Sequence, residues 1–249
     1  MISIYRSRSM SKKISGFGVI VNNAINVCSY HYDKFNNYNI KIDVGEINDL
    51  FNTRDFVSDS YYDIESDFNN LVVSGLYDNS SNSHVICDYE KVLKKNSVFE
   101  SIFKLKYLDD YKLSNLVNDK TLAIHLRGTD KSKEITPINT NQIINHIKNM
   151  IDNYDIDNIF ISTDDIFYRN LLISEFGNMI RFNDHCISLD SNPIHFIDNR
   201  VDINKEMIKD VYLISQSPYF LYSFSNVSYL ALTMGIKNFK KINCLNENI

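Results

Sequence analysis

The clearest pattern of apolar and polar positions lies in the second half of the chain. There TLAIHLR, from Thr121 to Arg127, is a short apolar run that ends in polar residues, which is typical of a buried parallel strand. A polar loop to Pro137 follows, residues 139–153 place apolar side chains at helical spacing, and NIFIS at 158–162 predicts the next strand. The pattern continues with a helix at about 165–176, a strand at about 179–182, a helix at about 204–215 and a strand at 219–224. Strands and helices that alternate in this way predict a Rossmann-like parallel sheet.

A short helix is predicted to follow the last of these strands. Ser225 stands where an N-cap residue belongs, and the run NVSYLALTM comes directly after it. Gly235 then occupies the C′ position, where glycine commonly ends a helix.

The first half of the chain has weaker periodicity. Gly16 and Gly18 precede an apolar-periodic run in SGFGVIVNNAINV, which predicts a tight turn that leads into a helix. NIKIDV at 39–44 alternates like a short strand, whereas residues 52–70 have no clear period and predict a long loop or an irregular helical region. Two weaker strand candidates are residues 71–74 and 84–87.

Length and composition narrow the class of protein. A chain of 249 residues has room for one large domain or two modest ones, and we expect two. The formal net charge of −5 argues against a general nucleic-acid binder, because a surface that follows phosphates needs clustered lysine and arginine. The four cysteines lie far apart with no C-x-x-C pair, which argues against a zinc framework or a disulfide scaffold. No segment approaches the roughly 20 apolar residues of a membrane span, and the N-terminus does not resemble a leader, so we expect a cytoplasmic protein.

Three polar clusters follow predicted strands. They are residues 125–131, residues 162–165 and residues 223–226. Because the carboxyl ends of parallel strands meet at one edge of a sheet, where ligands bind, we expect these clusters to lie together.

Arg127 and Ser225 are the candidates for binding an anion. The Arg127 guanidinium can hold a diphosphate with two parallel hydrogen bonds, although a structural salt bridge to Asp130 or to another carboxylate at a strand end is an equal alternative. Ser225 and the backbone N–H groups after it would form an anion site at a helix N-terminus, and the alternative is an ordinary helix cap.

The other polar residues of these clusters have structural alternatives too. Asp164 and Asp165 are adjacent and stand at a strand-to-helix junction, which favours capping of the helix over metal binding. His125 is either a satisfied core histidine or a contact to a base or phosphate. Glu134 and Lys131 are either solvated surface charges or members of the site.

Read together, HLRGTDKSKEITPI, FISTDD and DVYLISQSPYFLYSFSNVSYLAL resemble the α-1,6-fucosyltransferase and nodulation fucosyltransferase superfamily, with protein O-fucosyltransferases as more distant relatives. The similarity extends from Thr121 to about Gly235. Its most specific element is His-x-Arg-x-x-Asp-Lys followed by a nearby Glu, and SGFG near the N-terminus is similar to that family's Gly-aromatic-Gly loop.

The resemblance implies an α/β fold of the GT-B type, with two Rossmann-like lobes and a role for each. Residues 1–118 would form the acceptor lobe, and residues 119–249 would bind GDP-fucose, with no cofactor and no metal. Arg127 would hold the β-phosphate, and Glu134 would be the catalytic base with Lys131 beside it. The remaining donor-binding residues would be His125 and Asp210 around the guanine, Ser223, Phe224, Ser225 and Asn226 along the diphosphate, Asp164 and Asp165 on the second wall, and Asp130, Gly16 and Gly18.

These residue types suit an inverting transfer of fucose to a glycan or lipid-linked saccharide. Glu134 or His125 can take a proton from the acceptor hydroxyl, while Arg127 and the helix terminus neutralise the departing diphosphate. Two alternatives remain, a GT-B enzyme that uses another nucleotide sugar and a catalytically silent sugar-nucleotide or glycan-binding module. The sequence contains neither G-x-x-x-x-G-K-[ST] nor G-x-G-x-x-G, which disfavours a P-loop kinase or a dehydrogenase.

Overall fold

The computed structural model describes nine segments of the chain, which are residues 2–6, 17–36, 40–43, 51–53, 61–63, 89–105, 115–128, 138–183 and 200–246. The chain divides into two compact units, residues 1–108 and residues 109–249. The strand candidates at 71–74 and 84–87 and the polar loop before Pro137 lie outside the described residues.

The second unit is built on a parallel sheet of five strands in the order β10-β9-β6-β7-β8. The strands are β6 (Thr121–Leu126), β7 (Asn158–Thr163), β8 (Ile180–Phe182), β9 (Tyr219–Tyr222) and β10 (Lys241–Cys244). The predicted Rossmann-like sheet is therefore confirmed, and β10 is an additional edge strand that the sequence analysis missed.

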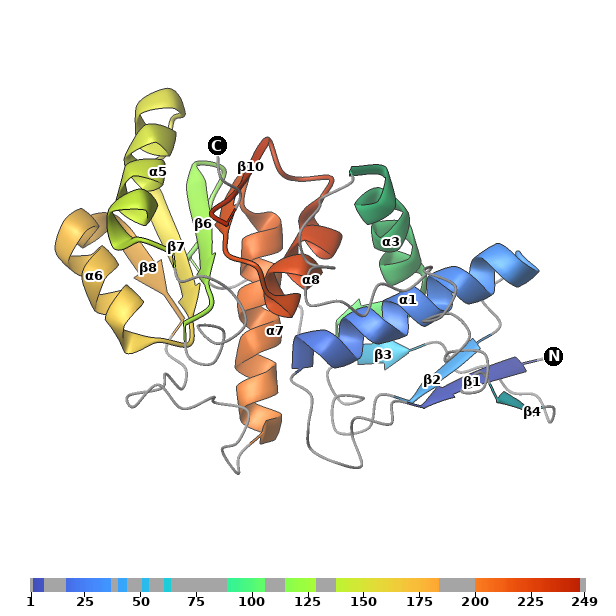
Figure 1. The fold of residues 1–249 in the computed structure, drawn as a ribbon. Coiled ribbons are helices and arrows are strands. Elements are labelled where there is room, and N and C mark those ends of the chain that lie inside the picture. The colour runs from blue at the N-terminus through green and yellow to red at the C-terminus, as the bar shows by residue number, and fades with distance from the viewer. Residues whose placement is uncertain are drawn as a thin grey trace. The chain divides into compact units, whose positions relative to one another are not determined.

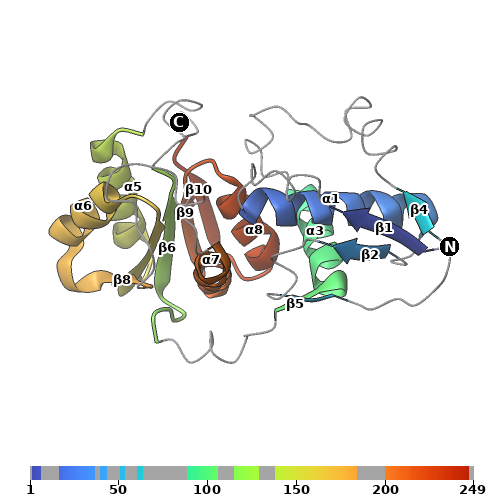
Figure 2. The same ribbon diagram turned by 90° about the horizontal axis from the view of Figure 1, so that it is seen from below.

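Helices cover both faces of this sheet (Figures 1 and 2). Helices α5 (Thr140–Asn153) and α6 (Ile166–Phe176) lie on one face, whereas α7 (Arg200–Gln216) and α8 (Asn226–Gly235) lie on the other. The chain thus winds from β6 outward through β7 to β8, returns by α7 to β9 on the other side of β6, and ends at β10.

The central strands β6 and β7 are buried on both faces, because helices pack against each side of the sheet. All six residues of β6 and all six of β7 are buried. Because side chains alternate along a strand, Ile124 and Leu126 join the cluster beneath α5, and the intervening His125 faces α8, where it contacts Ser228. Phe220 of β9 stacks on Phe239 at 5.4 Å between ring centroids.

The helix boundaries confirm one predicted cap and correct another. Ser225 is the N-cap of α8, and its side chain accepts a hydrogen bond from the Ser228 N–H. Gly235 is the last helical residue of α8 and not a left-handed C′ residue, since the C-cap is Ile236 in a right-handed conformation. A Cβ on Gly235 would lie 2.7 Å from the backbone Cα of Ser215, so close packing against α7 accounts for the glycine.

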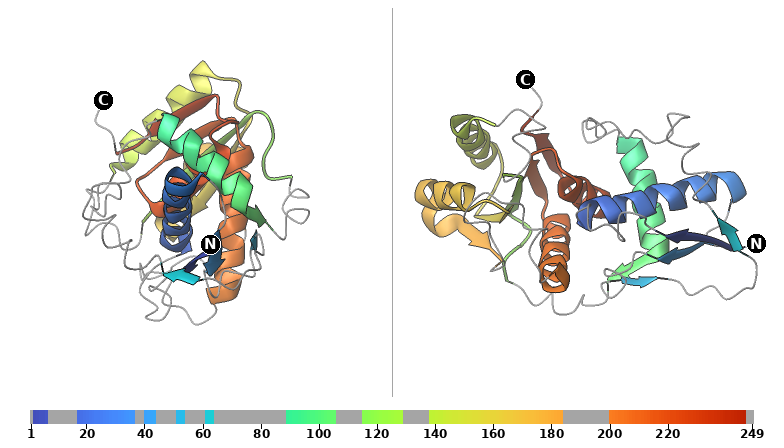
Figure 3. Two further views of the ribbon diagram at one scale, coloured as in Figure 1. Left: turned by 90° about the vertical axis from the view of Figure 1, so that its right-hand side faces the viewer. Right: turned by 60° about the horizontal axis from the view of Figure 1, so that its bottom comes forward.

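The described residues of the first unit form two small sheets and two helices that pack together (Figure 3). Strands β1 (Ile2–Arg6), β2 (Ile40–Asp43) and β4 (Tyr61–Asp63) are parallel in the order β2-β1-β4, and β3 (Phe51–Thr53) pairs antiparallel with β5 (Phe103–Leu105). The helices are α1 (Phe17–Phe35) and α3 (Tyr89–Ile102). Strand β2 and helix α1 confirm two predictions, but Gly18 lies inside the first turn of α1 and not before it.

Candidate functional site

The order of the five strands creates a switch point between β6 and β9. These strands are neighbours, with His125 paired to Tyr222. The chain leaves β6 toward α5 on one face of the sheet and leaves β9 toward α8 on the other. Loops that diverge in this way open a crevice at the carboxyl edge, where open α/β sheets bind ligands.

Hydrogen bonds join the two chain segments that border this switch point. The Ser223 N–H donates to the His125 carbonyl at 2.9 Å, and the Arg127 N–H donates to Ser223 Oγ at 2.8 Å. The structure therefore brings residue 127 together with the segment 223–226, from opposite ends of the second half of the chain.

The side chain of Arg127 forms an ion pair with Asp164, which follows β7. Only 14% of the arginine side chain and 6% of the aspartate side chain are exposed. The other carboxylate oxygen of Asp164 accepts the Gly128 N–H at 2.9 Å. The structural salt bridge considered from the sequence is thus present, and it holds the guanidinium at the carboxyl edge of the sheet.

Gly128 is required by the close approach of this loop to α6. A Cβ at this position would clash with the Cβ of Asp165 and lie 2.6 Å from its Oδ2. Asp165 is the N-cap of α6, and its Oδ1 accepts the Phe167 N–H at 2.8 Å, so its carboxylate cannot move away without uncapping the helix. The capping role predicted for this acidic pair is therefore observed at Asp165.

His125 belongs to a buried network of hydroxyl groups. Its Nδ1 lies 2.7 Å from Ser228 Oγ, and Ser228 Oγ donates its single proton to the Ser223 carbonyl at 2.7 Å. This arrangement allows the imidazole to donate from Nδ1 to Ser228 Oγ, and Nε2 would then be the acceptor in the neutral ring. Ser225 Oγ donates to Ser228 Oγ at 3.1 Å and accepts the Ser228 N–H at 2.9 Å. This network fixes the first turn of α8 against β6.

The remaining candidate residues are placed as follows. The Phe224 N–H donates to Asn246 Oδ1 at 2.7 Å, and Asn226 is the first residue of α8. Asp210 is buried on α7. Gly18 belongs to α1 of the first unit, whereas Gly16, Asp130, Lys131 and Glu134 lie outside the described residues.

The sequence analysis missed three residues that build this edge. Gly128 packs against Asp165, Ser228 is bonded to His125, and Asn246 accepts the Phe224 N–H. Each of these contacts joins residues that are distant in sequence. Ser228 alone had a sequence signal, because it stands three residues after the predicted cap.

The electrostatic field favours an anion at α8 over an anion at α6. Both helices begin at the carboxyl edge, and the first N–H groups of each have no partner within the helix. Helix α6 starts next to the carboxylates of Asp164 and Asp165. Burial raises the pKa of Tyr168 the most, and these two carboxylates raise it further. Helix α8 is capped by the neutral Ser225, so its positive end is not neutralised by its own cap.

We expect Ser228→Ala to lower the free energy of unfolding by about 2 kcal/mol, because it leaves three buried polar groups without this hydroxyl. Urea denaturation measures the change. Ser174→Ala is the matched control, since its exposed hydroxyl bonds only to the helix carbonyl of Leu171. Equal losses in the two variants would contradict the network described for His125.

The described segments contain neither a cluster of metal ligands nor a membrane-spanning helix. No group of three or more His, Cys, Asp or Glu side chains there is placed to hold a metal ion. None of the helices in these segments has the length and apolar character needed to cross a membrane.

Comparison with known proteins gives a structural likeness without a sequence match. No protein-family model matches the chain, and no curated protein matches it. NodZ α-1,6-fucosyltransferase soaked with GDP-fucose is 11% identical with a TM-score of 0.54, over 94% of this chain and 92% of that one. NodZ co-crystallized with GDP is 11% identical with a TM-score of 0.53, over 97% and 93% of the chains.

POFUT1 in complex with GDP-fucose is also similar at 11% identity, with a TM-score of 0.42 over 61% of this chain. The chain spans about half of the length of the POFUT1 structures that it matches. The likeness to NodZ confirms the fold implied by the sequence motifs. The chain therefore has a fucosyltransferase-like fold of the GT-B type.

Proposed function

We propose that this chain is an inverting fucosyltransferase that needs no metal ion and transfers fucose from GDP-fucose to a glycan or lipid-linked saccharide. One observation supports this most directly. The backbone N–H of Arg127 is bonded to Ser223, two residues before the N-cap of α8, at the switch point of a sheet whose fold is shared with NodZ, a fucosyltransferase whose structure was determined with GDP-fucose.

The charge on the departing diphosphate explains why Arg127 and the N-terminus of α8 would both be needed. When the bond from the anomeric carbon to the diphosphate breaks, negative charge grows on the phosphate oxygens. Fixed donors that face this charge stabilise the transition state more than the ground state. Arg127 and the first turn of α8 supply such donors, and they take the place that a metal ion occupies in other transferases.

Asp164 contributes by holding Arg127 in position. A guanidinium has five N–H groups, so an ion pair through Nη1 is compatible with phosphate contacts through others. The carboxylate is itself anchored by the Gly128 N–H. The arginine is therefore ordered before the donor binds, which lowers the entropy cost of binding.

The other roles follow from the family resemblance. His125 and Asp210 would recognise guanine, whose ring N–H and amino groups are donors that an imidazole nitrogen or a carboxylate accepts. Asp165, Asp130 and the segment 223–226 would complete the donor pocket. Glu134, with Lys131 beside it, would take the proton from the acceptor hydroxyl. The second unit would bind the donor, and the first unit would serve the acceptor.

We expect GDP and GDP-fucose to stabilise the protein against thermal unfolding. A ligand at 100 times its Kd adds about 2.7 kcal/mol to the free energy of unfolding, whereas UDP and ADP should add far less. Differential scanning fluorimetry with the four ligands measures this, followed by assay of transfer to an oligosaccharide panel. Preference for UDP or ADP would indicate another nucleotide sugar, and GDP binding without donor turnover would indicate a silent binding module. Either result contradicts the proposal.

A further inference from the structure

The outer face of helix α5 carries a row of amide side chains beside the charged Lys148 and Asp152. Its inner face is buried, and asparagine recurs on the outer face at every fourth position, at residues 141, 145, 149 and 153. Residues four apart lie one above another on a helix, so these side chains form a ladder. Gln142 and His146 form a second ladder beside it, which continues to Met150 and Tyr154.

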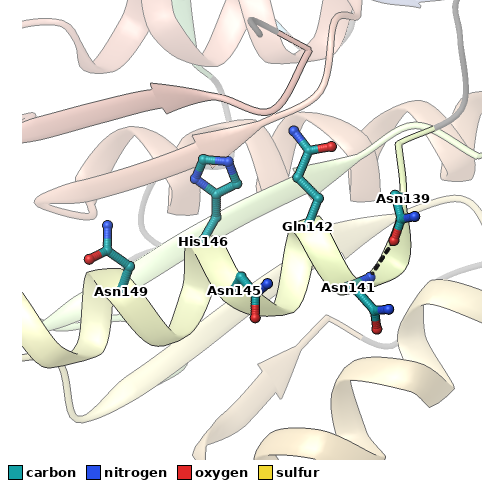
Figure 4. A pocket seen from close by; sticks show the side chains of 6 residues that line it. All are labelled: Asn139, Asn141, Gln142, Asn145, His146 and Asn149. Atoms are coloured by element: carbon teal, nitrogen blue, oxygen red, sulfur yellow. Dashed lines mark hydrogen bonds between the residues drawn. The ribbon is translucent and has the colours of Figure 1, made fainter. Parts of the chain in front are cut away.

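Two adjoining hollows follow these ladders, and together they are called the amide groove. The first has a volume of about 540 Å³, and its lining is drawn in Figure 4: Asn139, Asn141, Gln142, Asn145, His146 and Asn149. The second, of about 500 Å³, shares His146 and Asn149 with the first and extends to Lys241 and Asn243 on strand β10. The groove therefore runs along α5 toward the edge strand of the sheet.

The side chains that line the groove are almost all uncharged. Lys148 of α5 is on a different flank, where it pairs with Glu175 of α6 at 3.6 Å. Among the described residues that line the two hollows, Lys241 is the one lysine, arginine, aspartate or glutamate. The outer face of a surface helix usually bears lysine and glutamate, and an anionic or cationic ligand would need opposite charges here. The charge of the groove thus matches a neutral, polar ligand.

The chemistry of the lining selects hydroxyl groups. Each amide side chain both donates and accepts hydrogen bonds, and so does a sugar hydroxyl. Several amides are already held in place, since Asn153 Nδ2 donates to Asn149 Oδ1 at 2.7 Å and Gln142 Nε2 donates to the Leu245 carbonyl at 3.3 Å. Tyr154 and Ile242 in the second hollow, both partly exposed, offer apolar surface for the C–H faces of sugar rings.

We propose that the amide groove binds a neutral oligosaccharide that lies along α5. This site differs from the diphosphate edge, because its lining comes from the outer face of α5 and from β10 and includes neither Arg127 nor residues 223–226. The proposal does not depend on GDP-fucose or on transfer, and it is tested without nucleotide.

The test is titration calorimetry of the whole chain with maltohexaose, cellohexaose and mannohexaose, and with oligogalacturonate as a charged probe. We expect at least one neutral probe to bind, and the triple variant Asn141→Ala, Asn145→Ala, His146→Ala to weaken its binding at least tenfold. Alanine favours a helix more than asparagine or histidine does, so the variant should keep its melting temperature. Asn170→Ala, an exposed amide on α6, is the matched control and should bind as the unmodified chain does.

Three outcomes would overturn the proposal. They are no binding of any neutral probe, stronger binding of oligogalacturonate than of every neutral probe, and unchanged binding by the triple variant. Stabilisation by GDP is measured separately in the same variants, and we expect no change. Failure of the groove and failure of the donor site are therefore distinguishable.

Discussion

Replacing Arg127 with alanine is expected to lower kcat/KM for fucosyl transfer by about 10³-fold, because it removes a fixed donor that faces the departing diphosphate. The same substitution should also lower the free energy of unfolding by about 3 kcal/mol. The reason is Asp164, which would remain nearly buried without its guanidinium partner. Loss of activity in this variant alone would therefore be ambiguous between catalysis and folding.

A second variant separates these two effects. In Arg127→Ala combined with Asp164→Asn, no buried charge is left without its partner, and the amide oxygen can still accept the Gly128 N–H. We expect this double variant to regain most of the lost stability in urea denaturation and to remain inactive. Asp164→Asn alone keeps the guanidinium but loses its anchor, so it should retain part of the activity. A double variant with nearly normal kcat/KM would refute the role of Arg127.

The second half of the chain could be predicted because its periodicity is strong. Residues 139–153 repeat their apolar positions with helical spacing, and 121–126 and 158–163 are short apolar runs between polar loops. These local patterns do not depend on a partner strand. The order of the strands does depend on one, and so the switch point between β6 and β9 was not predicted.

The elements that the sequence analysis missed have weak local patterns. Strand β10 has four residues with only Cys244 buried, and β1 has five residues next to a charged segment. Helix α3 contains YEKVLKKNSVFESI, in which charged residues interrupt the apolar positions. Strands β1 and β10 are defined by pairing with other strands, and α3 packs against α1, so none of the three is evident from a local pattern.

The candidate site shows the same division. Strand polarity alone indicated that residues 125–131, 162–165 and 223–226 gather at one edge, because each follows a parallel strand. The partner of the Arg127 side chain and the proton position on His125 depend on tertiary contacts with Asp164 and Ser228. From the sequence, Arg127 could pair with a carboxylate or a phosphate, and His125 could be a core residue or a ligand contact. The tertiary contacts show which groups are already hydrogen-bonded or ion-paired.

The structure gives Gly235 a different role from the one predicted from the sequence. As a left-handed C′ residue it would tolerate asparagine, which also adopts that conformation. In the structure it is helical, and helix propensity alone would then favour alanine by about 1 kcal/mol. Packing predicts the opposite sign, because any Cβ would lie 2.7 Å from the backbone of Ser215 and 2.5 Å from the ring of Phe239.

We therefore expect Gly235→Ala to lower the free energy of unfolding by about 3 kcal/mol, as overpacking pushes α8 away from α7. Gly235→Asn should be worse still, which distinguishes packing from a C′ role. Adding Phe239→Leu to Gly235→Ala should restore only part of the loss, since the Ser215 backbone cannot move aside as a side chain can. Urea denaturation of the three variants measures these values. Because displacement of α8 also displaces Ser225 and its first turn, stabilisation by GDP should fall in parallel, and a stable Gly235→Asn variant would contradict the close packing.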